Sequence, residues 1–266
     1  MTGFKPETEL DHAYEAKMRS PEDQASQLAY YHRFADAELC LLLESDADGD
    51  RLTPAVFELA EGRFVLAFDS DDRLANFSDT PMPFVALPGR VIVAELAGQA
   101  IGVGVNLGVS ESAFLMPAGA VDWLADALAA SPREGMALPV SFAAVSTAGL
   151  AGRLEEKLKG LGHLANAVWL AEARHADGRI AMAVVFADAR PEAEAALAKT
   201  AGEVVQFAGF DPAGVDVLFL NGDQVERSEL SRVGQRVAIS APKAVEAIRV
   251  APLAPGSDPG KPPILR

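Results

Sequence analysis

Three glycines and one asparagine lie close together at the end of an apolar run. Gly102, Gly104, Asn106 and Gly108 alternate with valines and a leucine in the segment Ile101–Val109. A glycine-rich turn that follows a buried strand can hold a phosphate, because its backbone N–H groups can point at the anion. These four residues are therefore the candidate binding site for a nucleotide or another small molecule.

The spacing of these glycines departs from the dinucleotide-binding fingerprint. That fingerprint reads G-x-G-x-x-G and opens a helix at once. Here Gly108 comes one residue later, and the chain continues into Phe114–Met116, which predicts a short strand. The alternative is a packing role, in which Gly102 and Gly104 allow a neighbouring element to approach closely and Asn106 or Gly108 forms a left-handed turn. The packing role is favoured, and ligand binding stays open as the alternative.

The histidines and the single cysteine give no pattern that predicts catalysis or metal binding. The chain has four histidines, His12, His32, His163 and His175. None has a histidine or cysteine at metal-ligand spacing. His163, at a helix end, and His175, in a turn, are expected to lie in solvent. Cys40 stands among leucines, where a small core residue is expected. No catalytic residue, metal or cofactor is predicted.

The charge balance limits the partners that the chain can bind. Its 23 basic and 38 acidic residues give a formal net charge of −15. Such a surface repels nucleic acid and anionic lipid headgroups, but it suits a basic protein partner. The polar N-terminus has no apolar leader, and no apolar run is long enough to cross a bilayer. We therefore expect a cytoplasmic protein that binds neither nucleic acid nor membrane, with a protein partner or a homo-oligomer left open.

Helical and strand-like segments alternate in the first half of the chain. The expected helices are Glu9–Met18, Ser20–Phe34, Asp69–Phe77 and a segment that opens at Pro117. The expected strands are Leu39–Leu43, Val56–Leu59, Phe64–Phe68, Phe84–Leu87, Ala100–Leu107 and Phe114–Met116. Pro88–Leu96 is ambiguous, because Pro88 favours a helix start and Val91–Val93 favours a strand.

A similar alternation follows in the second half. The expected helices are Leu150–Leu161, Pro191–Ala201 and a short one over Val225–Val233. The expected strands are Ala137–Val145, Ala165–Ala173, Arg179–Ala187, Val204–Phe207, Val215–Leu220 and Arg236–Ile239. If Val215–Leu220 is a sheet edge, it could receive a strand from a partner.

This order of elements predicts an α/β or α+β fold with two small mixed-sheet domains and helices packed on the sheets. Ser131–Gly135 is the expected boundary between them. The predicted division is an N-terminal helical extension (1–34), a first domain (35–135), a second domain (136–250) and a Pro-rich tail (251–266). The tail contains five prolines and two glycines, a composition typical of an extended segment.

Several segments resemble the SseB family. Phe68–Phe77 resembles the strand end and short helix of SseB-like proteins, and Leu87–Arg90 with Gly102–Leu107 resembles a later block of that family. In that block the family has Asn-Pro-Gly, whereas Asn106 here is followed by Leu107. Residues 35–130 carry this similarity, and residues 137–250 look like an SseB-type C-terminal domain.

The resemblance implies a family and a fold, but no chemistry. It supplies no catalytic residue that can be transferred to this chain. We therefore expect a non-enzymatic binding or regulatory protein, a cytoplasmic scaffold for protein interactions. The alternative is a binding protein or an enzyme that takes a small molecule or nucleotide at the Gly102–Gly108 loop.

Overall fold

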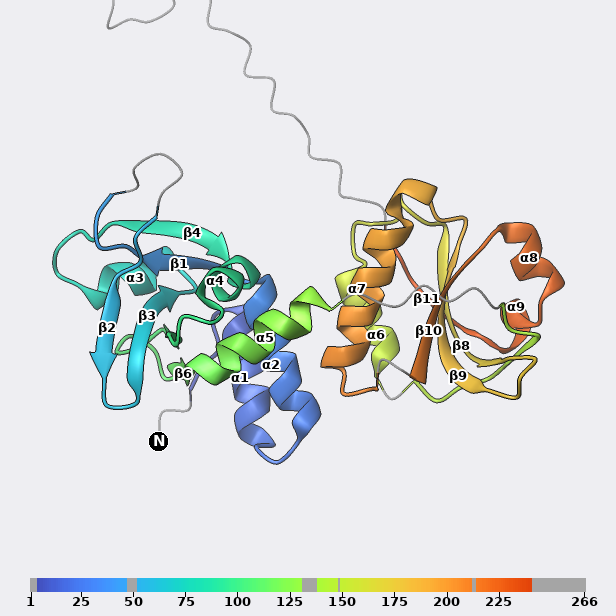
Figure 1. The fold of residues 1–266 in the computed structure, drawn as a ribbon, viewed down its shortest axis with the longest axis horizontal. Coiled ribbons are helices and arrows are strands. Elements are labelled where there is room, and N and C mark those ends of the chain that lie inside the picture. Colours follow the sequence, from blue (N-terminus) through green and yellow to red (C-terminus); the bar gives the residue numbers. More distant parts are fainter. Residues whose placement is uncertain (1–3, 47–51, 131–137, 148, 212–213, 241–266) are drawn as a thin grey trace, which may run out of the picture.

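A computed structural model describes residues 4–46, 52–130, 138–147, 149–211 and 214–240. It contains two β-sheets, one in each half of the chain, and helices pack on both (Figure 1). The α/β or α+β class predicted from the sequence is confirmed. Within the described residues no helix is both long and apolar enough to span a membrane. The expected boundary at 131–135 and the tail at 251–266 lie outside the described residues, so the domain division stays a prediction.

The N-terminal half holds a six-stranded mixed sheet in the order β4-β1-β3-β5-β6, with β2 paired to β3. Only β3 and β5 run parallel to each other as neighbours. The elements are α1 (Glu9–Arg19), α2 (Gln24–Asp36), β1 (Glu38–Leu42), β2 (Val56–Leu59), β3 (Gly62–Phe68), α3 (Asp71–Phe77), β4 (Phe84–Pro88), α4 (Gly89–Leu96), β5 (Gly102–Val105), β6 (Phe114–Met116) and α5 (Ala118–Ala129).

Polar caps set the starts of the first three helices. Thr8 and Asp11 form a reciprocal capping box at α1, and the Asp23 carboxylate accepts two backbone N–H groups at α2. Ser70 caps α3, as its position before an acidic turn predicts. The expected start of the second helix at Ser20 was wrong, because Asp23 satisfies the free N–H groups three residues later.

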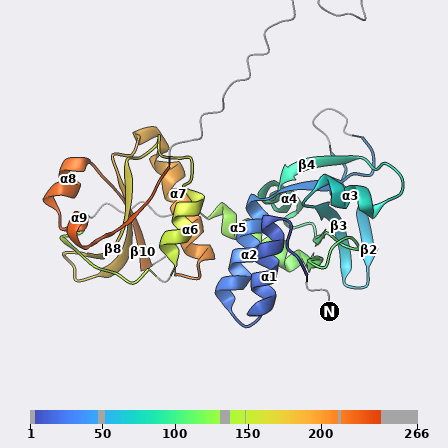
Figure 2. The same cartoon turned by 180° about the vertical axis from the view of Figure 1, so that it is seen from behind.

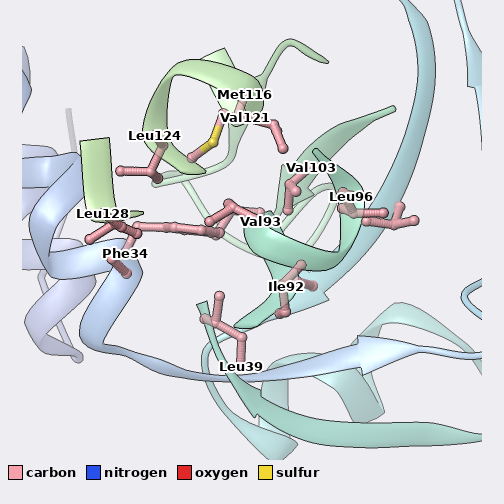
Figure 3. Close-up of a cluster of buried hydrophobic side chains, with 14 of the residues drawn as sticks. Phe34, Leu39, Ile92, Val93, Leu96, Val103, Met116, Val121, Leu124 and Leu128 are labelled. Carbon is pink, nitrogen blue, oxygen red and sulfur yellow. The ribbon is translucent and has the colours of Figure 1, made fainter. Parts of the chain in front are cut away.

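Both faces of the N-terminal sheet are buried at β1 and β3, so β1 is apolar at successive positions rather than at alternate ones. Leu39 and Leu41 face a core formed with α2, α4 and α5, whereas Cys40 and Leu42 face a smaller cluster under α3. The larger core is shown in Figure 3, where side chains from three helices and the sheet converge. Its labelled members are Phe34, Leu39, Ile92, Val93, Leu96, Val103, Met116, Val121, Leu124 and Leu128. Val103 and Val105 place β5 in this core.

The C-terminal half holds a five-stranded sheet in the order β10-β9-β8-β11, with β7 also paired to β8. β9 and β10 are parallel, and the other pairs are antiparallel. The elements are β7 (Ser141–Ala143), α6 (Leu150–Lys157), β8 (Ala167–Arg174), β9 (Ile180–Ala187), the 3₁₀ helix η1 (Pro191–Ala193), α7 (Glu194–Phe207), β10 (Val215–Leu220), α8 (Gly222–Arg227), α9 (Leu230–Val233) and β11 (Gln235–Val237). α6 and α7 cover one face, while α8 and α9 pack on the other.

Two short apolar segments show where a local pattern misleads. The expected strand at Val204–Phe207 was wrong, because these residues form the last turn of α7. Leu197, Ala201, Val204 and Val205 recur at helical spacing and share one buried face. The ambiguous segment 88–96 is helix α4, which Pro88 precedes at the N-cap position. In both cases the segment is a helix because its apolar side chains cover a face of the sheet.

The two halves meet along α2 and α5 on one side and α6 and α7 on the other (Figures 1 and 2). Phe207, the last residue of α7, is fully buried and belongs to the N-terminal core. Its ring stacks on His32 with 4.8 Å between centroids and meets the edge of Trp123 at 6.1 Å. One aromatic side chain of the C-terminal half thus completes the core of the N-terminal half.

Candidate functional site

Gly102 and Gly104 lie in β5 where neighbouring side chains occupy the space that a side chain would need. A Cβ atom on Gly102 would stand 2.5 Å from both the Phe64 ring and the Met116 carbonyl oxygen. A Cβ atom on Gly104 would stand 2.6 Å from Leu107 and 2.8 Å from Leu66. At Gly102 a backbone oxygen blocks any larger residue, whereas at Gly104 the blocking atoms belong to leucine side chains, which would have to shift.

Asn106 and Gly108 form the turn that leaves β5. Both have left-handed backbone conformations, with φ of 51° and 77°. Asn106 is buried, and its Oδ1 accepts the backbone N–H of Asp69 at 3.1 Å. The four residues therefore follow one another along β5 and the turn at its end, with packing and turn roles. Ligand binding by Gly102, Gly104, Asn106 and Gly108 stays a prediction.

A buried ionic network lies beside Asn106. We call it the Asp11 cluster, and it consists of Asp11, Asp69, Arg73, Asn106 and Ser112. Arg73 donates from Nη2 to Asp11 Oδ2 at 2.6 Å and from Nη1 to Asp69 Oδ1 at 2.7 Å. Ser112 donates its hydroxyl to Asp11 Oδ1 at 2.6 Å. The cluster joins α1, the end of β3, α3 and the segments on either side of the turn after β5.

Hydrogen bonds keep Asp11 ionised although it is fully buried. Burial alone would raise its pKa, but the hydrogen bonds from Arg73, Ser112 and the Glu7 backbone outweigh burial and lower the pKa to about 2. The carboxylates in turn raise the pKa of Arg73. The sequence does not predict this cluster. Asp11 lies in a short, charged segment, a pattern typical of a helix exposed to solvent.

The expected burial of Cys40 agrees with the structure, whereas the expected exposure of His175 does not. Cys40 is buried, as expected, and its Sγ lies 3.2 Å from Asp71 Oδ1. Burial and the nearby Asp71 raise the pKa of this thiol to about 12, which makes it a poor nucleophile. The expected exposure of His175 was wrong, because only 6% of it is accessible. Its side chain contacts Asp216 and Arg179.

The expected edge strand is present as β10. It pairs with β9 over six residues, from Val215 opposite Met182 to Leu220 opposite Ala187. On its other side no strand is found in the described parts of the chain. Its side chains are apolar on both faces of the sheet, except for Asp216. An apolar edge of this kind is a ready template for an added strand.

The Asp216 carboxylate on β10 is bound by two side chains of the β8–β9 hairpin. Arg179 donates from Nη1 to Asp216 Oδ1 at 2.9 Å, and His175 Nε2 lies 2.7 Å from Asp216 Oδ2. Burial raises the pKa of Asp216, but these two hydrogen bonds lower it by more, and the net shift is downward. The one charge in the strand is thereby neutralised, so it does not protect the edge against pairing.

A pocket of about 300 Å³ opens where the halves meet. Its lining includes His32, Asp36, Arg153 and Lys157. Lys157 donates to Asp36 at 2.5 Å and lies 3.3 Å from His32 Nε2. Burial, followed by the positive charge of Lys157, lowers the pKa of His32 to about 4. The charges in the pocket already pair across the junction, so its chemistry is that of a domain contact.

The comparisons with known proteins concern the N-terminal half. Residues 10–123 match the family model described as the SseB protein N-terminal domain. No curated protein and no solved structure matches the chain. The matched residues include the Asp11 cluster and the four residues of the glycine-rich turn. The assignment of residues 137–250 to an SseB-type C-terminal domain stays a prediction.

Proposed function

The chain belongs to the SseB family through its N-terminal half, and on that premise we propose that it is a non-enzymatic binding or regulatory protein of the cytoplasm. It acts as a scaffold that receives an extended segment of a partner protein on β10. The observation that carries this proposal is the apolar edge of β10, which pairs fully with β9 and meets no further strand in the described residues.

Strand addition uses the features that β10 presents. Backbone hydrogen bonds supply affinity, and side chains on the two faces supply specificity. Val217 and Phe219 are half-buried against the α6–α7 face, and Leu218 is buried on the opposite face. An added strand would cover both sets of side chains further, so it would extend two hydrophobic clusters at once.

Charge favours a basic partner. The net charge of −15 gives a negative potential that accelerates the approach of a cationic segment and slows that of an acidic one. Because Asp216 is paired with Arg179, the partner's positive charges would face the surrounding surface rather than the strand itself. The expected partner segment is therefore extended, apolar at alternate positions and flanked by lysine or arginine.

Site-specific crosslinking tests this proposal. A photoreactive residue at Val215 should crosslink one cytoplasmic protein, and the same residue at Ile180, an exposed position on β9, should not. A synthetic peptide of the crosslinked segment should then bind the purified chain, and V217K should weaken binding at least tenfold while I180K leaves it unchanged. Equal crosslinking from both positions, or a peptide that binds V217K as well as the unmodified chain, would reject the proposal.

A further inference from the structure

Asp11 is held in the way that a protein holds a carboxylate ligand. Both of its oxygens accept from Arg73, at 2.6 and 3.0 Å, and Oδ1 also accepts from Ser112. The backbone N–H of Glu7 adds a fourth hydrogen bond at 2.9 Å. This two-point contact with arginine is the geometry by which proteins recognise carboxylates. All of these contacts go to one residue at the start of α1.

The position of the cluster in the fold is one that commonly holds ligands. Asp69 and Asn106 follow the carboxyl ends of the parallel strands β3 and β5. From those ends the chain runs in opposite directions, through α3 to β4 beyond β1 and through a loop to β6 at the far edge. In open sheets such a reversal leaves a crevice in which ligands bind. Here the Asp11 carboxylate of α1 fills that position, and the residues around it are buried.

Two buried polar atoms near the cluster have no partner. Asn106 Nδ2 and Tyr30 Oη form no hydrogen bond within the described residues, although both side chains are almost fully buried. Tyr30 is close enough for the charges of Asp69 and Asp11 to add to the effect of burial in raising its pKa. Buried donors without partners are rare and costly. Arg73 and Ser112 donate to Asp11, but Asn106 Nδ2 and Tyr30 Oη have no acceptor among the described residues. The Asp11 carboxylate therefore does not satisfy all the hydrogen-bond donors around it.

α1 is held by apolar and aromatic contacts as well as by Asp11, because Leu10 lies in the core and Tyr14 meets the edge of the Tyr30 ring at 6.2 Å. The buried residues of this helix are Leu10, Asp11 and Lys17. Lys17 Nζ lies 3.5 Å above the Phe114 ring, and burial lowers the pKa of this lysine. No carboxylate pairs with it in the described part of the chain. Displacement of α1 therefore has to break the Asp11 hydrogen bonds together with these apolar and aromatic contacts.

We propose that the crevice at the ends of β3 and β5 is a binding site for the carboxylate of a small organic acid, and that Asp11 is its built-in competitor. The external carboxylate takes the place of Asp11 against Arg73 and Ser112, and α1 leaves the sheet. Asn106 and Tyr30 donate to other polar atoms of the same ligand. This site is separate from β10 and does not depend on the proposed partner strand.

The first test removes the competitor in the full-length chain. D11A should bind acetate at neutral pH and constant ionic strength, with an affinity at least tenfold above that of the unmodified chain, read as a rise in Tm and by calorimetric titration. Adding S112A should weaken acetate binding about tenfold, because one hydrogen bond to a charged group is lost. E15A, which alters only an exposed pair with Arg19 on the same helix, should respond as the unmodified chain does. An equal acetate response in all four proteins, or none in D11A, would overturn the proposal.

The second test needs no substitution and covers the case in which D11A does not fold. Saturating acetate should accelerate hydrogen–deuterium exchange in residues 9–19 several-fold, while exchange in β3 and β5 stays the same or slows. Unchanged or slower exchange in α1, with acetate bound, would contradict displacement of the helix. Sodium chloride at the same ionic strength serves as the control, because it screens charge without presenting a carboxylate.

Discussion

The molecule contains two ionic networks that differ chiefly in their access to water. The Asp11 cluster lies inside the N-terminal half, where Asp11 is 0% and Arg73 is 7% exposed. The second network, which we call the junction network, joins the halves through Asp36, Arg90, Lys157 and Glu203. There the side chains of Arg90 and Asp36 are 34% and 29% exposed. Ion pairs of similar length therefore contribute different free energies to the two networks, because water screens the junction network and not the Asp11 cluster.

The junction depends on an aromatic contact as well as on charge. Phe207 enters the N-terminal core between His32 and Trp123, and Arg153 donates to its carbonyl oxygen at 3.1 Å. Arg33 also pairs with Glu156 across the junction. The comparison thus teaches that buried charge stabilises one half internally, whereas the contact between halves relies mainly on one buried ring and is adjusted by exposed charges.

Removing the central cation of the Asp11 cluster should have the largest effect. R73M leaves Asp11 and Asp69 buried without a counter-ion, and we expect a loss of about 4–5 kcal/mol in the free energy of unfolding. Chemical denaturation monitored by tryptophan fluorescence and circular dichroism measures this loss. R19M, at an exposed pair on α1, is the control and should change stability by less than about 0.5 kcal/mol. Equal losses in the two variants would show that burial does not distinguish them.

Truncating the ring at the junction should rank second. F207A removes a fully buried aromatic side chain, which costs about 3–4 kcal/mol. The cost should come largely from separation of the halves, so limited proteolysis should cut near residues 131–137 faster. F219A, a half-buried ring in the C-terminal half that stacks on Phe186, is the matched control. Faster cleavage near 131–137 in F219A than in F207A would contradict the role given to Phe207.

Mild acid should weaken the junction first. The pKa of His32 is about 4 in the folded chain and 6.5 when unperturbed, so between those values the unfolded chain binds a proton that the folded chain does not. Stability is therefore full above pH 6.5 and falls as pH drops toward 4, by up to about 3 kcal/mol. H32F should flatten this part of the stability curve, and H163F, at an exposed histidine, should not. A slope that persists in H32F would assign it to another group.

Stronger acid should weaken the Asp11 cluster. The pKa of Asp11 falls from 3.8 to about 2 on folding, so its ionised form stabilises the folded chain above pH 3.8. That contribution, about 2 kcal/mol, is lost as pH falls through 2. D11N should lack this transition, while the loss between pH 6.5 and 4 should persist. If D11N instead removed the loss of stability between pH 6.5 and 4, the effects of pH on the two networks could not be separated.

The smallest effect should come from Lys157, a half-buried charge at the junction. K157M removes the pair with Asp36 and should cost less than about 1 kcal/mol, because that pair is partly solvated. The difference between K157M and the unmodified chain should shrink further in 0.5 M salt, where screening is stronger. R73M should keep nearly its full cost in the same salt. Equal salt sensitivity in both variants would remove the distinction between the networks.

Much of the fold follows from local pattern. The strand at Leu39–Leu43, the strands at Val56–Leu59 and Phe64–Phe68 and the short helix that ends at Phe77 were expected, because apolar runs, a turn signal and an acidic first turn each act over a few residues. Val204–Phe207 was misassigned because a four-residue apolar run fits either conformation. The helix was decided by the sheet face that α7 covers.

The candidate sites divide in the same way. The sequence by itself determined the β10 strand and a left-handed turn at Asn106 or Gly108, since both depend on neighbours along the chain; the structure has this conformation at both residues. Only the tertiary structure decided that Gly102 lies under Phe64, that His175 reaches Asp216, and that Asp11 meets Arg73 and Ser112. These contacts join residues 38 to 101 positions apart. Their free energies come from burial, which no local pattern records, because burial depends on which elements the sheet brings together.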